Sequence, residues 1–362
     1  MKRITAILLV LTVVLSLLLS GCGCSKKPAD TEPSTEATLA PTEATTPALT
    51  LPLQDPNRHP LTGEKLAEPW SGQIVAVKVN NIRDAMPQHG VSQADVVYEI
   101  EEEGTTRNMA LYSDISKVDR IGSIRSTRTY FVSVAAAYDA YLVHCGTSTH
   151  ANNGGYDHNG NKVSNWKDID EQKGAYSQYF YRDKDRYSAG YAWEHTLFTS
   201  GERLAKALEG KPMSAPKTGF IFKEGVELTG GETANEITIK FKTSGKTTTF
   251  IYDAETGLYA RNQYGKACID GNNQQLDAVK NVITLYTKQW YCSQGHGHHY
   301  YDTIGSGEGY AAVNGKIVPI KWSRASVDAP YIYTLADGSP LEMDVGRSYI
   351  AIVGEKFPIE YK

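Results

Sequence analysis

Hydrophobic and polar positions alternate with the period of a β-strand in the part of the chain that follows Pro60. Ile74–Val79 is a run rich in β-branched residues, and Asp95–Glu101 alternates apolar and polar side chains. Arg107–Tyr112 is a third, shorter run of the same kind. These patterns are typical of strands.

The period changes after these strands. Beyond Ser126 or Thr127, either of which can cap a helix, four apolar residues recur at helical spacing. They are Tyr130, Phe131, Val134 and Tyr138. A strand at about Arg120–Ile124 precedes this helix, and an apolar strand, Tyr141–Cys145, follows it. This order predicts a β-α-β unit with a parallel pair of strands and a right-handed crossover. Ser200–Leu208 is a second helix candidate.

Short strands separated by glycine turns follow Pro212. The candidates are Glu236–Phe241, Thr247–Tyr252, Leu258–Arg261, Val282–Tyr286, Gly309–Val313, Ile317–Trp322, Tyr331–Leu335 and Ser348–Val353. Asn314-Gly315 and Asp337-Gly338 are hairpin signals. The predicted fold class is therefore α+β, with an N-terminal mixed α/β domain over residues 59–212 and a mainly antiparallel β domain over residues 213–362.

The start of the chain has the pattern of an export signal. Lys2 and Arg3 precede an apolar stretch, Ile4–Leu19, and the sequence Leu-Ser-Gly-Cys then ends at Cys22. Small residues before a cysteine predict a lipoprotein signal peptide over residues 1–21, with lipid, including palmitate, on Cys22. An uncleaved anchor with an incidental cysteine is the alternative. Either arrangement places the rest of the chain at the extracytoplasmic face of the cell membrane.

Residues 22–58 are dominated by Thr, Pro, Ala and Glu, with hardly any large apolar side chain. Such a segment cannot bury enough surface to offset the entropy of ordering, so we expect a disordered linker. The whole chain of 362 residues carries a net charge of −4, which argues against nucleic-acid binding. Five cysteines in a chain of this length do not make a disulfide scaffold.

The candidate ligand site follows from the predicted β-α-β unit. Arg125, Ser126 and Arg128 begin the helix, and the next strand ends at His144, followed by Thr147 and Ser148. Open α/β sheets bind ligands at the edge where strands end, and arginine forks beside a helix N-terminus favour an anion. We therefore predict ligand binding by Arg125, Ser126, Arg128, His144 and Arg107. The alternative is a structural network of these arginines with Glu99, Glu101 or Glu103.

Those three glutamates share one face if their strand continues, with neighbouring Cα atoms about 6.6 Å apart. Only an adjacent pair could then serve a glycosidase, and only one of the inverting kind. Glu99, Glu103 and His144 are the candidate acid or base residues of an enzyme. The common hydrolase and redox motifs are missing from the sequence, so enzymatic activity is left open.

The remaining cysteines and histidines give weaker signals. Cys145 is adjacent to His144 on a strand, where neighbours face opposite sides, so a buried structural thiol is favoured. A Cys268–Cys292 disulfide and a metal site at His296–His299 are both left open. We predict no cofactor and no resident metal, and the sequence does not determine the oligomeric state.

Several motifs resemble the YerB-type lipoprotein family. They are Pro60–Gly63, Pro87–Arg107, Gly122–Phe131, Gly305–Arg324 and the closing GRSYIAIV. The resemblance covers nearly everything after the linker and implies two domains of unknown function on an exported lipoprotein. It brings no catalytic residue. The family pattern Gly-Pro-Val-Arg-Ser-Ala-Arg-Pro corresponds here to Gly122–Thr129, which keeps Arg125, Ser126 and Arg128 but lacks the prolines. Where the family tends to have two glycines after the His144 position, this chain has Cys145-Gly146.

The sequence thus favours a membrane-anchored extracytoplasmic lipoprotein that binds an anionic cell-wall or lipid ligand. The alternative is a hydrolase or transferase acting on phosphate-bearing envelope glycan or lipid. A third possibility is a protein partner docked on the C-terminal domain.

Overall fold

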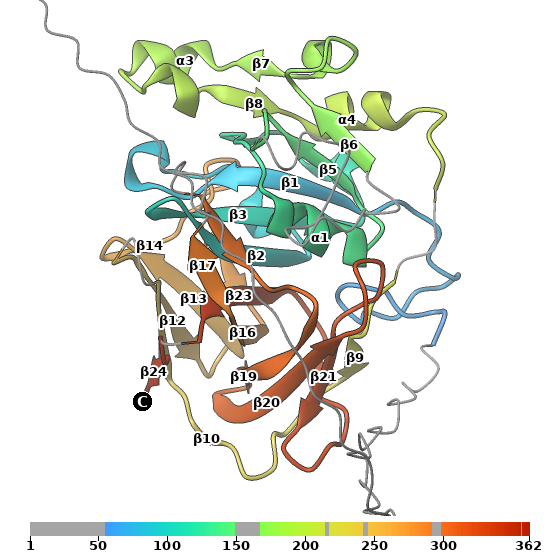
Figure 1. The fold of residues 1–362 in the computed structure, drawn as a ribbon, viewed down its shortest axis with the longest axis vertical. Helices are drawn as coiled ribbons and strands as arrows, with labels where there is room; N and C mark the ends of the chain where they lie inside the picture. The colour runs from blue at the N-terminus through green and yellow to red at the C-terminus, as the bar shows by residue number, and fades with distance from the viewer. Residues whose placement is uncertain (1–54, 149–166, 214–216, 242–244, 292–297, 356) are drawn as a thin grey trace, which may run out of the picture. The chain divides into compact units, whose positions relative to one another are not determined.

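One large sheet contains strands from both predicted domains (Figure 1). The computed structural model describes residues 55–148, 167–213, 217–241, 245–291, 298–355 and 357–362. The eleven strands of the sheet run in the order β10-β20-β19-β16-β23-β2-β3-β1-β5-β6, with β21 paired to β20. The first region contributes β1 Val75–Asn80, β2 Val96–Glu102, β3 Thr105–Tyr112, β5 Tyr141–His144 and β6 Lys167–Asp170. The second contributes β10 Glu232–Thr233, β16 Asn281–Thr287, β19 Gly305–Val313, β20 Lys316–Arg324, β21 Ile332–Leu335 and β23 Ser348–Gly354.

The two regions meet at β2 and β23, which pair in parallel from Val96 opposite Ser348 to Ile100 opposite Ile352. The sheet therefore runs across the division predicted between residues 212 and 213, and from Leu51 onward the chain forms one compact unit. The two-domain division stays a prediction. The signal peptide at residues 1–21, Cys22 and nearly all of the linker lie outside the described residues.

The α+β fold class is confirmed, since strands dominate and helices are few. The α-helices in the described part of the chain are α1 Thr129–Ala137, α3 Lys184–Ser188 and α4 Gly201–Leu208. Helix α4 matches its prediction, because Ser200 is its N-cap and its hydroxyl accepts a hydrogen bond from the Arg203 N–H. Helix α1 begins later than predicted, since its N-cap is Arg128 in extended conformation, with no side-chain capping bond.

The strand pairing around α1 differs in one detail from the predicted unit. The short strand before α1, β4 Ile121–Gly122, pairs antiparallel with β8 Leu197–Thr199 in a small sheet that also holds β7 Tyr181–Arg182. Strand β5 instead pairs in parallel with β1 and β6. The reason is that the chain after β4 turns back onto β1, where the Arg125 N–H donates to the Lys78 carbonyl.

A second, smaller antiparallel sheet packs on one face of the large sheet. Its strands are β11 Glu236–Lys240, β12 Thr247–Asp253, β13 Leu258–Gln263, β14 Lys266–Ala267, β15 Ala278–Val279 and β24 Glu360–Tyr361. Phe250 and Tyr259 from this sheet share one core with Val97 and Tyr349. Helix α1 covers the other face, where Phe131 packs in a second core.

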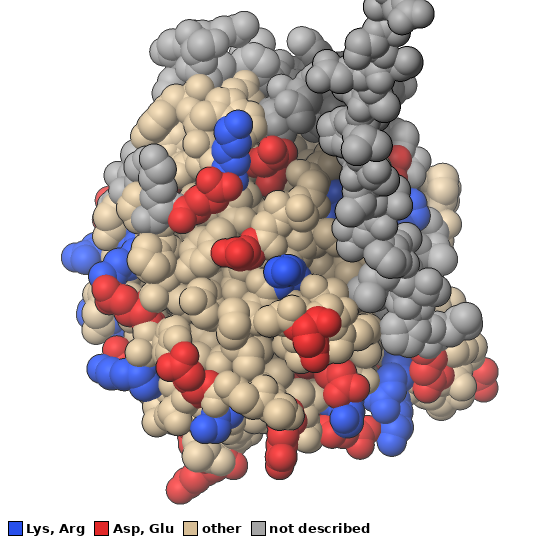
Figure 2. Space-filling view, turned by 60° about the horizontal axis from the view of Figure 1, so that its bottom comes forward, with Lys and Arg blue, Asp and Glu red and all other residues tan. Residues whose placement is uncertain are grey.

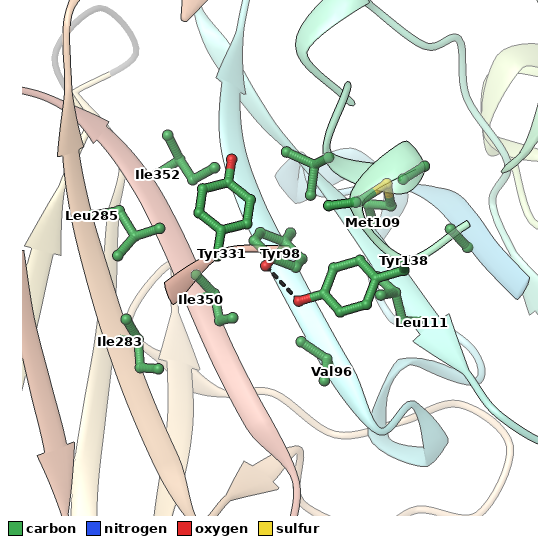
Figure 3. Close-up of a cluster of buried hydrophobic side chains, with 14 of the residues drawn as sticks. Val96, Tyr98, Met109, Leu111, Tyr138, Ile283, Leu285, Tyr331, Ile350 and Ile352 are labelled. Carbon is green, nitrogen blue, oxygen red and sulfur yellow. Dashed lines mark hydrogen bonds between the residues drawn. The ribbon is translucent and has the colours of Figure 1, made fainter. Parts of the chain in front are cut away.

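Alternation along each strand separates these two cores. Figure 3 shows the α1 side, where Val96 and Tyr98 of β2 lie with residues of β3, β16 and β23. The Tyr98 and Tyr138 hydroxyls are 2.7 Å apart and hydrogen-bonded. Side chains from both sequence regions therefore fill a single core.

Two hairpins have the backbone that the primed turns require. Glu103 and Gly104, between β2 and β3, have φ of 44° and 77°, and Asn314 and Gly315, between β19 and β20, have φ of 48° and 75°. The hairpin predicted at Asn314-Gly315 is thus confirmed. The remaining strands are β9 Ile221–Lys223, β17 Gln289–Tyr291, β18 His299–Tyr301 and β22 Glu342–Asp344. Short 3₁₀ helices occur at Arg83–Ala85, Val91–Gln93, Ile115–Lys117, Ser177–Tyr179 and Trp193–His195.

No helix within the described ranges has both the length and the apolar character needed to cross a membrane. On the face shown in Figure 2, acidic and basic side chains are interspersed rather than gathered by sign. Among the residues that the structure describes, this face therefore shows no patch of a single sign that would mark an anion site.

Candidate functional site

The predicted arginine cluster is divided into two environments. Arg128 makes a bidentate contact with Glu103, donating from Nε at 2.7 Å and from Nη2 at 2.6 Å. Its Nη2 is also 3.4 Å from Oε1 of Glu102. Arg107 Nε is 4.0 Å from the same oxygen, and Lys78 Nζ is 3.5 Å from the other oxygen of Glu102. The structural alternative, an arginine–carboxylate network, describes this group.

The centre of this network is sealed from solvent, since Lys78, Glu102 and Arg107 are buried, whereas Arg128 and Glu103 lie at its edge. Burial opposes ionisation of Glu102, yet the cations Lys78, Arg128 and Arg107 hold the pKa of this carboxyl below its ordinary value. Lys78 Nζ also lies 2.8 Å from the centroid of the Phe131 ring on α1. Glu103 thus occupies the fork of Arg128, and Arg107 is buried beside Glu102, so this geometry does not support the ligand-binding role predicted for these two arginines.

Arg125 lies apart from this network, in a hollow of about 220 Å³. We call it the Arg125 hollow; its lining is Ile124, Arg125, Ser126, Cys145, Gln172, Arg182, Trp193, Glu194 and Leu197. Nη1 of Arg125 is 3.9 Å from Glu194 Oε2, a loose ion pair. The buried Nε of Arg125 has no hydrogen-bond partner among the described residues.

Arg182 is the second cation of the Arg125 hollow. Its Nη1 donates to the Trp193 carbonyl at 2.8 Å, and its guanidinium carbon lies 4.5 Å from the centroid of the Trp193 ring. Trp193 itself is 57% exposed, and exposed Tyr187 makes an edge contact with it. The hollow thus combines two guanidinium groups with an accessible aromatic surface.

Backbone hydrogen bonds hold residues 125–127 beside residues 145–147, as the sequence predicts. The Cys145 N–H donates to the Arg125 carbonyl at 3.1 Å, and the Thr127 N–H donates to the Gly146 carbonyl at 3.0 Å. Thr127 also forms a parallel bridge with Thr147. The residues before α1 and those after β5 are therefore neighbours, as predicted.

His144 does not reach the Arg125 hollow, since it lies fully buried beside Asp168 and Asp170 of β6. Its Nε2 is 3.6 Å from Asp168 Oδ2, and its Nδ1 is 3.7 Å from Asp170 Oδ1. Potential ligand atoms of these three residues lie within 4.8 Å of one another, so they could hold a metal ion.

The carboxylates of that group are already engaged. Lys173 donates to Asp168 at 2.5 Å, and Oδ1 of Asp170 accepts the backbone N–H groups of Gly146 and Gln172. The cluster is therefore accounted for by ion pairs and a turn, and we assign it no metal.

The two glutamates named as acid or base candidates are separated. Strand β2 ends at Glu102, so Glu103 lies in the hairpin turn beside Arg128 rather than on one face with Glu99. The shared face expected for Glu99, Glu101 and Glu103 is therefore wrong, because the turn interrupts the strand.

Glu99 is fully buried on the side of the smaller sheet. Its carboxylate accepts hydrogen bonds from Asn81, Thr106, Thr248 and Tyr349 at 2.6–2.7 Å, and Lys246 Nζ is 3.2 Å away. Burial opposes ionisation, but Lys246 and the hydroxyl donors hold the pKa of Glu99 below its ordinary value. A permanently ionised carboxylate is a poor general acid.

The two cysteines that the structure describes are not activated. The Cys145 thiol donates to Glu171 at 3.1 Å, and burial together with this carboxylate raises its pKa to about 12. Cys268 carries a free thiol, and burial raises its pKa as well. Cys292, the other half of the disulfide that the sequence left open, lies outside the described residues. His296 is also outside them, whereas His298 lies 3.4 Å from Glu103 and His299 lies 3.1 Å from Gln289.

Comparisons with known proteins agree with this architecture. Residues 61–214 match the N-terminal domain, and residues 237–350 the C-terminal domain, of a protein family of unknown function, DUF3048. The chain belongs to this family.

One relative is a Bacillus subtilis (strain 168) protein named "Putative lipoprotein YerB". It is 26% identical over 306 residues, which cover 82% of this chain and 86% of the relative. The crystal structure of YerB protein from Bacillus subtilis matches with a TM-score of 0.68 and 22% identity, covering 84% of this chain and 99% of that one. The structural likeness establishes the fold, and the family description assigns no activity.

Proposed function

We propose that this protein is a lipid-anchored extracytoplasmic binding protein whose Arg125 hollow holds an anionic group of a cell-envelope polymer or lipid. The observation that carries the proposal is the pair of guanidinium groups, Arg125 and Arg182, beside the exposed ring of Trp193. A loosely held arginine can exchange its protein carboxylate for a ligand phosphate or carboxylate at little cost.

The location rests on the start of the sequence and on the family. Residues 1–21 have the pattern of a lipoprotein signal that ends at Cys22, and the Bacillus subtilis relative is named as a lipoprotein. The Thr- and Pro-rich linker would let the folded unit reach away from the bilayer towards the wall. Anionic polymers and headgroups are abundant ligands of the right chemistry there.

The make-up of the hollow favours a glycan or lipid headgroup that bears phosphate or carboxylate. Arginine forks hold such anions through two parallel hydrogen bonds, and an exposed tryptophan offers a flat apolar face to a sugar ring. Ser126 and Gln172 add neutral polar groups to the lining. Glu99 and His144 are both fully buried and absent from that lining, which favours binding over the alternative of a hydrolase or transferase.

The test measures retention of the chain from Leu51 to Lys362 on purified wall sacculi that keep or lack their anionic polymers. Arg125→Gln combined with Arg182→Gln is expected to lower polymer-dependent retention at least tenfold. A matched control removes two positive charges of α4 that lie outside the hollow, through Arg203→Gln and Lys206→Gln, and should keep retention within twofold.

Three other outcomes would contradict or redirect the proposal. Equal losses in the two double variants would mean that overall charge, rather than the hollow, drives retention, and the proposal would fail. Release of soluble fragments from the sacculi would favour the enzyme alternative. Retention that does not depend on anionic polymer would rule out the polymer as the ligand. Binding to vesicles is then compared with and without anionic lipid: binding that needs the anionic lipid would make a lipid headgroup the ligand, and no binding would exclude it.

A further inference from the structure

A second cavity, of about 350 Å³, lies against strands β13 and β14 in the second half of the chain. We call it the Arg261 cavity. Met86, Val91 and Ile269 contribute apolar walls, while Arg261, Gln263 and Cys268 contribute polar atoms. It shares no lining residue with the Arg125 hollow. A concave, largely apolar space of this size with a few fixed polar groups is typical of a small-molecule site.

The first polar group is an arginine with an unused donor. Arg261 is only 2% exposed. Its Nε is 2.7 Å from Asp277 Oδ2, and its Nη2 donates to Gln88 Oε1 at 2.6 Å. Among the described residues Nη1 has no hydrogen-bond partner, and Nε forms an ion pair with Asp277 but no aligned hydrogen bond. Because the ion pair and the Gln88 hydrogen bond hold the guanidinium group, Nη1 is kept in place as a charged donor.

The second polar group is an acceptor without a donor. Gln263 is 4% exposed, and its Nε2 donates to Thr248 Oγ1 at 2.7 Å and is 3.3 Å from Glu99 Oε1. Its Oε1 has no donor within the described part of the chain. The amide orientation is set by Thr248, because that hydroxyl already donates to Glu99 and can only accept. Buried polar atoms in native proteins are rarely left unpaired without a functional or solvent reason.

The charges around the cavity favour an anion. Asp277 is shared between Arg261 and Arg347, whose Nη2 is 3.0 Å away, so one carboxylate faces two guanidinium groups. Arg83 and Lys266 add two more cations to the lining. The other acidic residue, Asp270, accepts the backbone N–H groups of Gly90 and Ser92. Positive charge therefore exceeds negative charge at this cavity.

We propose that the Arg261 cavity binds a small carboxylate with an apolar body and an N–H or O–H group beside the carboxylate. The carboxylate accepts from Nη1 of Arg261, the neighbouring N–H or O–H donates to Oε1 of Gln263, and the apolar body packs between Met86, Val91 and Ile269. An N-acylated apolar amino acid has this chemistry. The site is separate from the proposed function, since it shares no residue with the Arg125 hollow.

Cys268 supplies the readout, because its free thiol lines the same cavity. The experiment uses residues 51–362, which form a compact unit, with Cys145→Ser and Cys292→Ser. The rate at which N-ethylmaleimide labels Cys268 is measured with three probes. N-acetyl-leucine carries both groups, 4-methylpentanoate lacks the N–H donor, and N-acetyl-leucinamide lacks the carboxylate. Calorimetric titration of the same fragment with its native cysteines gives binding without relying on the thiol.

N-acetyl-leucine is expected to slow labelling at least tenfold at saturation, and each incomplete probe should bind at least fivefold more weakly. Ile269→Trp should fill the cavity and abolish both protection and calorimetric binding. Leu276→Trp is the matched control: Ile269 and Leu276 form a β-bridge and are 38% and 49% exposed, and only Ile269 lines the cavity.

Three results would overturn the proposal. The first is that no probe protects Cys268 or binds by calorimetry. The second is equal binding of the acid and the amide, which would remove the role of Arg261. The third is equal loss of binding in the two tryptophan variants, which would place the effect on stability rather than on the cavity.

Discussion

Two groups of arginines in the N-terminal region have different environments. Arg128 holds Glu103 through two short hydrogen bonds, and Arg107 lies buried 4.0 Å from Glu102. Arg125 and Arg182 line a hollow in which the nearest carboxylate, Glu194, is 3.9 Å from Arg125. The comparison teaches that residue type and sequence position do not separate a structural arginine from a binding one. What separates them is whether a carboxylate already fills the fork.

The local backbone explains why the side chains of Arg125 and Arg128 point to opposite sides. If both stood at the start of a helix, their side chains would lie on neighbouring positions of one turn. Instead Thr127 pairs with Thr147 as in a strand, and Arg128 has extended dihedral angles. Residues three apart in an extended segment point to opposite sides. One arginine therefore turns towards the β2–β3 hairpin and the other towards Trp193.

The largest effect is expected from removing the carboxylate at the centre of the sealed network. Glu102→Gln leaves the buried cations Lys78 and Arg107 without their shared partner, so we expect a loss of about 3–5 kcal/mol of unfolding free energy. Glu194→Gln makes the same change in the Arg125 hollow and should cost less than about 0.5 kcal/mol, because Glu194 is exposed. Urea denaturation measures the unfolding free energy of each variant. Similar losses in the two variants would contradict the difference between the buried network and the Arg125 hollow.

The arginines themselves give the second largest effect. Arg128→Gln removes the two charge-assisted hydrogen bonds to Glu103 and should cost about 2–3 kcal/mol of unfolding free energy. Arg125→Gln should cost less than about 1 kcal/mol, since its ion pair is long. Retention on anionic polymer should follow the reverse order, with the larger loss for Arg125→Gln. A variant of Arg128 that folds stably yet loses retention would place the ligand at the sealed network instead.

A third test measures how the free energy of unfolding depends on pH through Lys246, the partner of the buried carboxylate Glu99. Burial lowers the pKa of its partner Lys246 to about 8, below the ordinary value of 10.5, although Glu99 opposes the shift. Between these two values the unfolded chain binds a proton that the folded chain has released, so stability rises with pH. From pH 7.5 to 9.5 we expect a gain of about 2 kcal/mol in the wild type relative to Lys246→Gln.

Lys266→Gln serves as the control for that measurement, because Lys266 is exposed and should leave the pH dependence unchanged. Denaturation at several pH values above 7 supplies the curves, and identical curves for the wild type and Lys246→Gln would show that Lys246 keeps an ordinary pKa. The arginines of the Arg125 hollow stay charged throughout this window, and the raised pKa of Cys145 acts equally in the wild type and the variant.

The sequence predicted most of the strands but not their neighbours. The sequence located β2, β3 and β16 to within two residues of their ends, and each of these strands has both faces in a core. No local pattern indicates that β2 pairs with β23, more than two hundred residues later in the chain. The shared sheet depends on long-range pairing, which local patterns do not encode.

The candidate site was predicted only in part, because local patterns do not show which distant residues become neighbours. The approach of residues 125–127 to residues 145–147 follows from the order of elements and is confirmed. Arg182 and Trp193 were missed, because they belong to a short strand and a 3₁₀ helix with no strong period. Glu102 and Lys78 had a usable signal, since a charged residue within an apolar strand must find a buried partner.

The smallest expected effect concerns Glu194, the loose ion-pair partner of Arg125. If Arg125 binds the ligand, Glu194 competes with the ligand for the same guanidinium group, because the two residues form a loose ion pair in the free protein. Glu194→Gln should then raise affinity for anionic polymer about two- to fivefold, equivalent to about 0.4–1 kcal/mol. Added salt should narrow the gain, because exposed ion pairs are screened. In an Arg125→Gln background the same change should have no effect, since the competition is gone. A gain in affinity that persists in the Arg125→Gln background would mean that Glu194 acts only by repelling the polymer. That result would contradict a specific contact between Arg125 and the ligand.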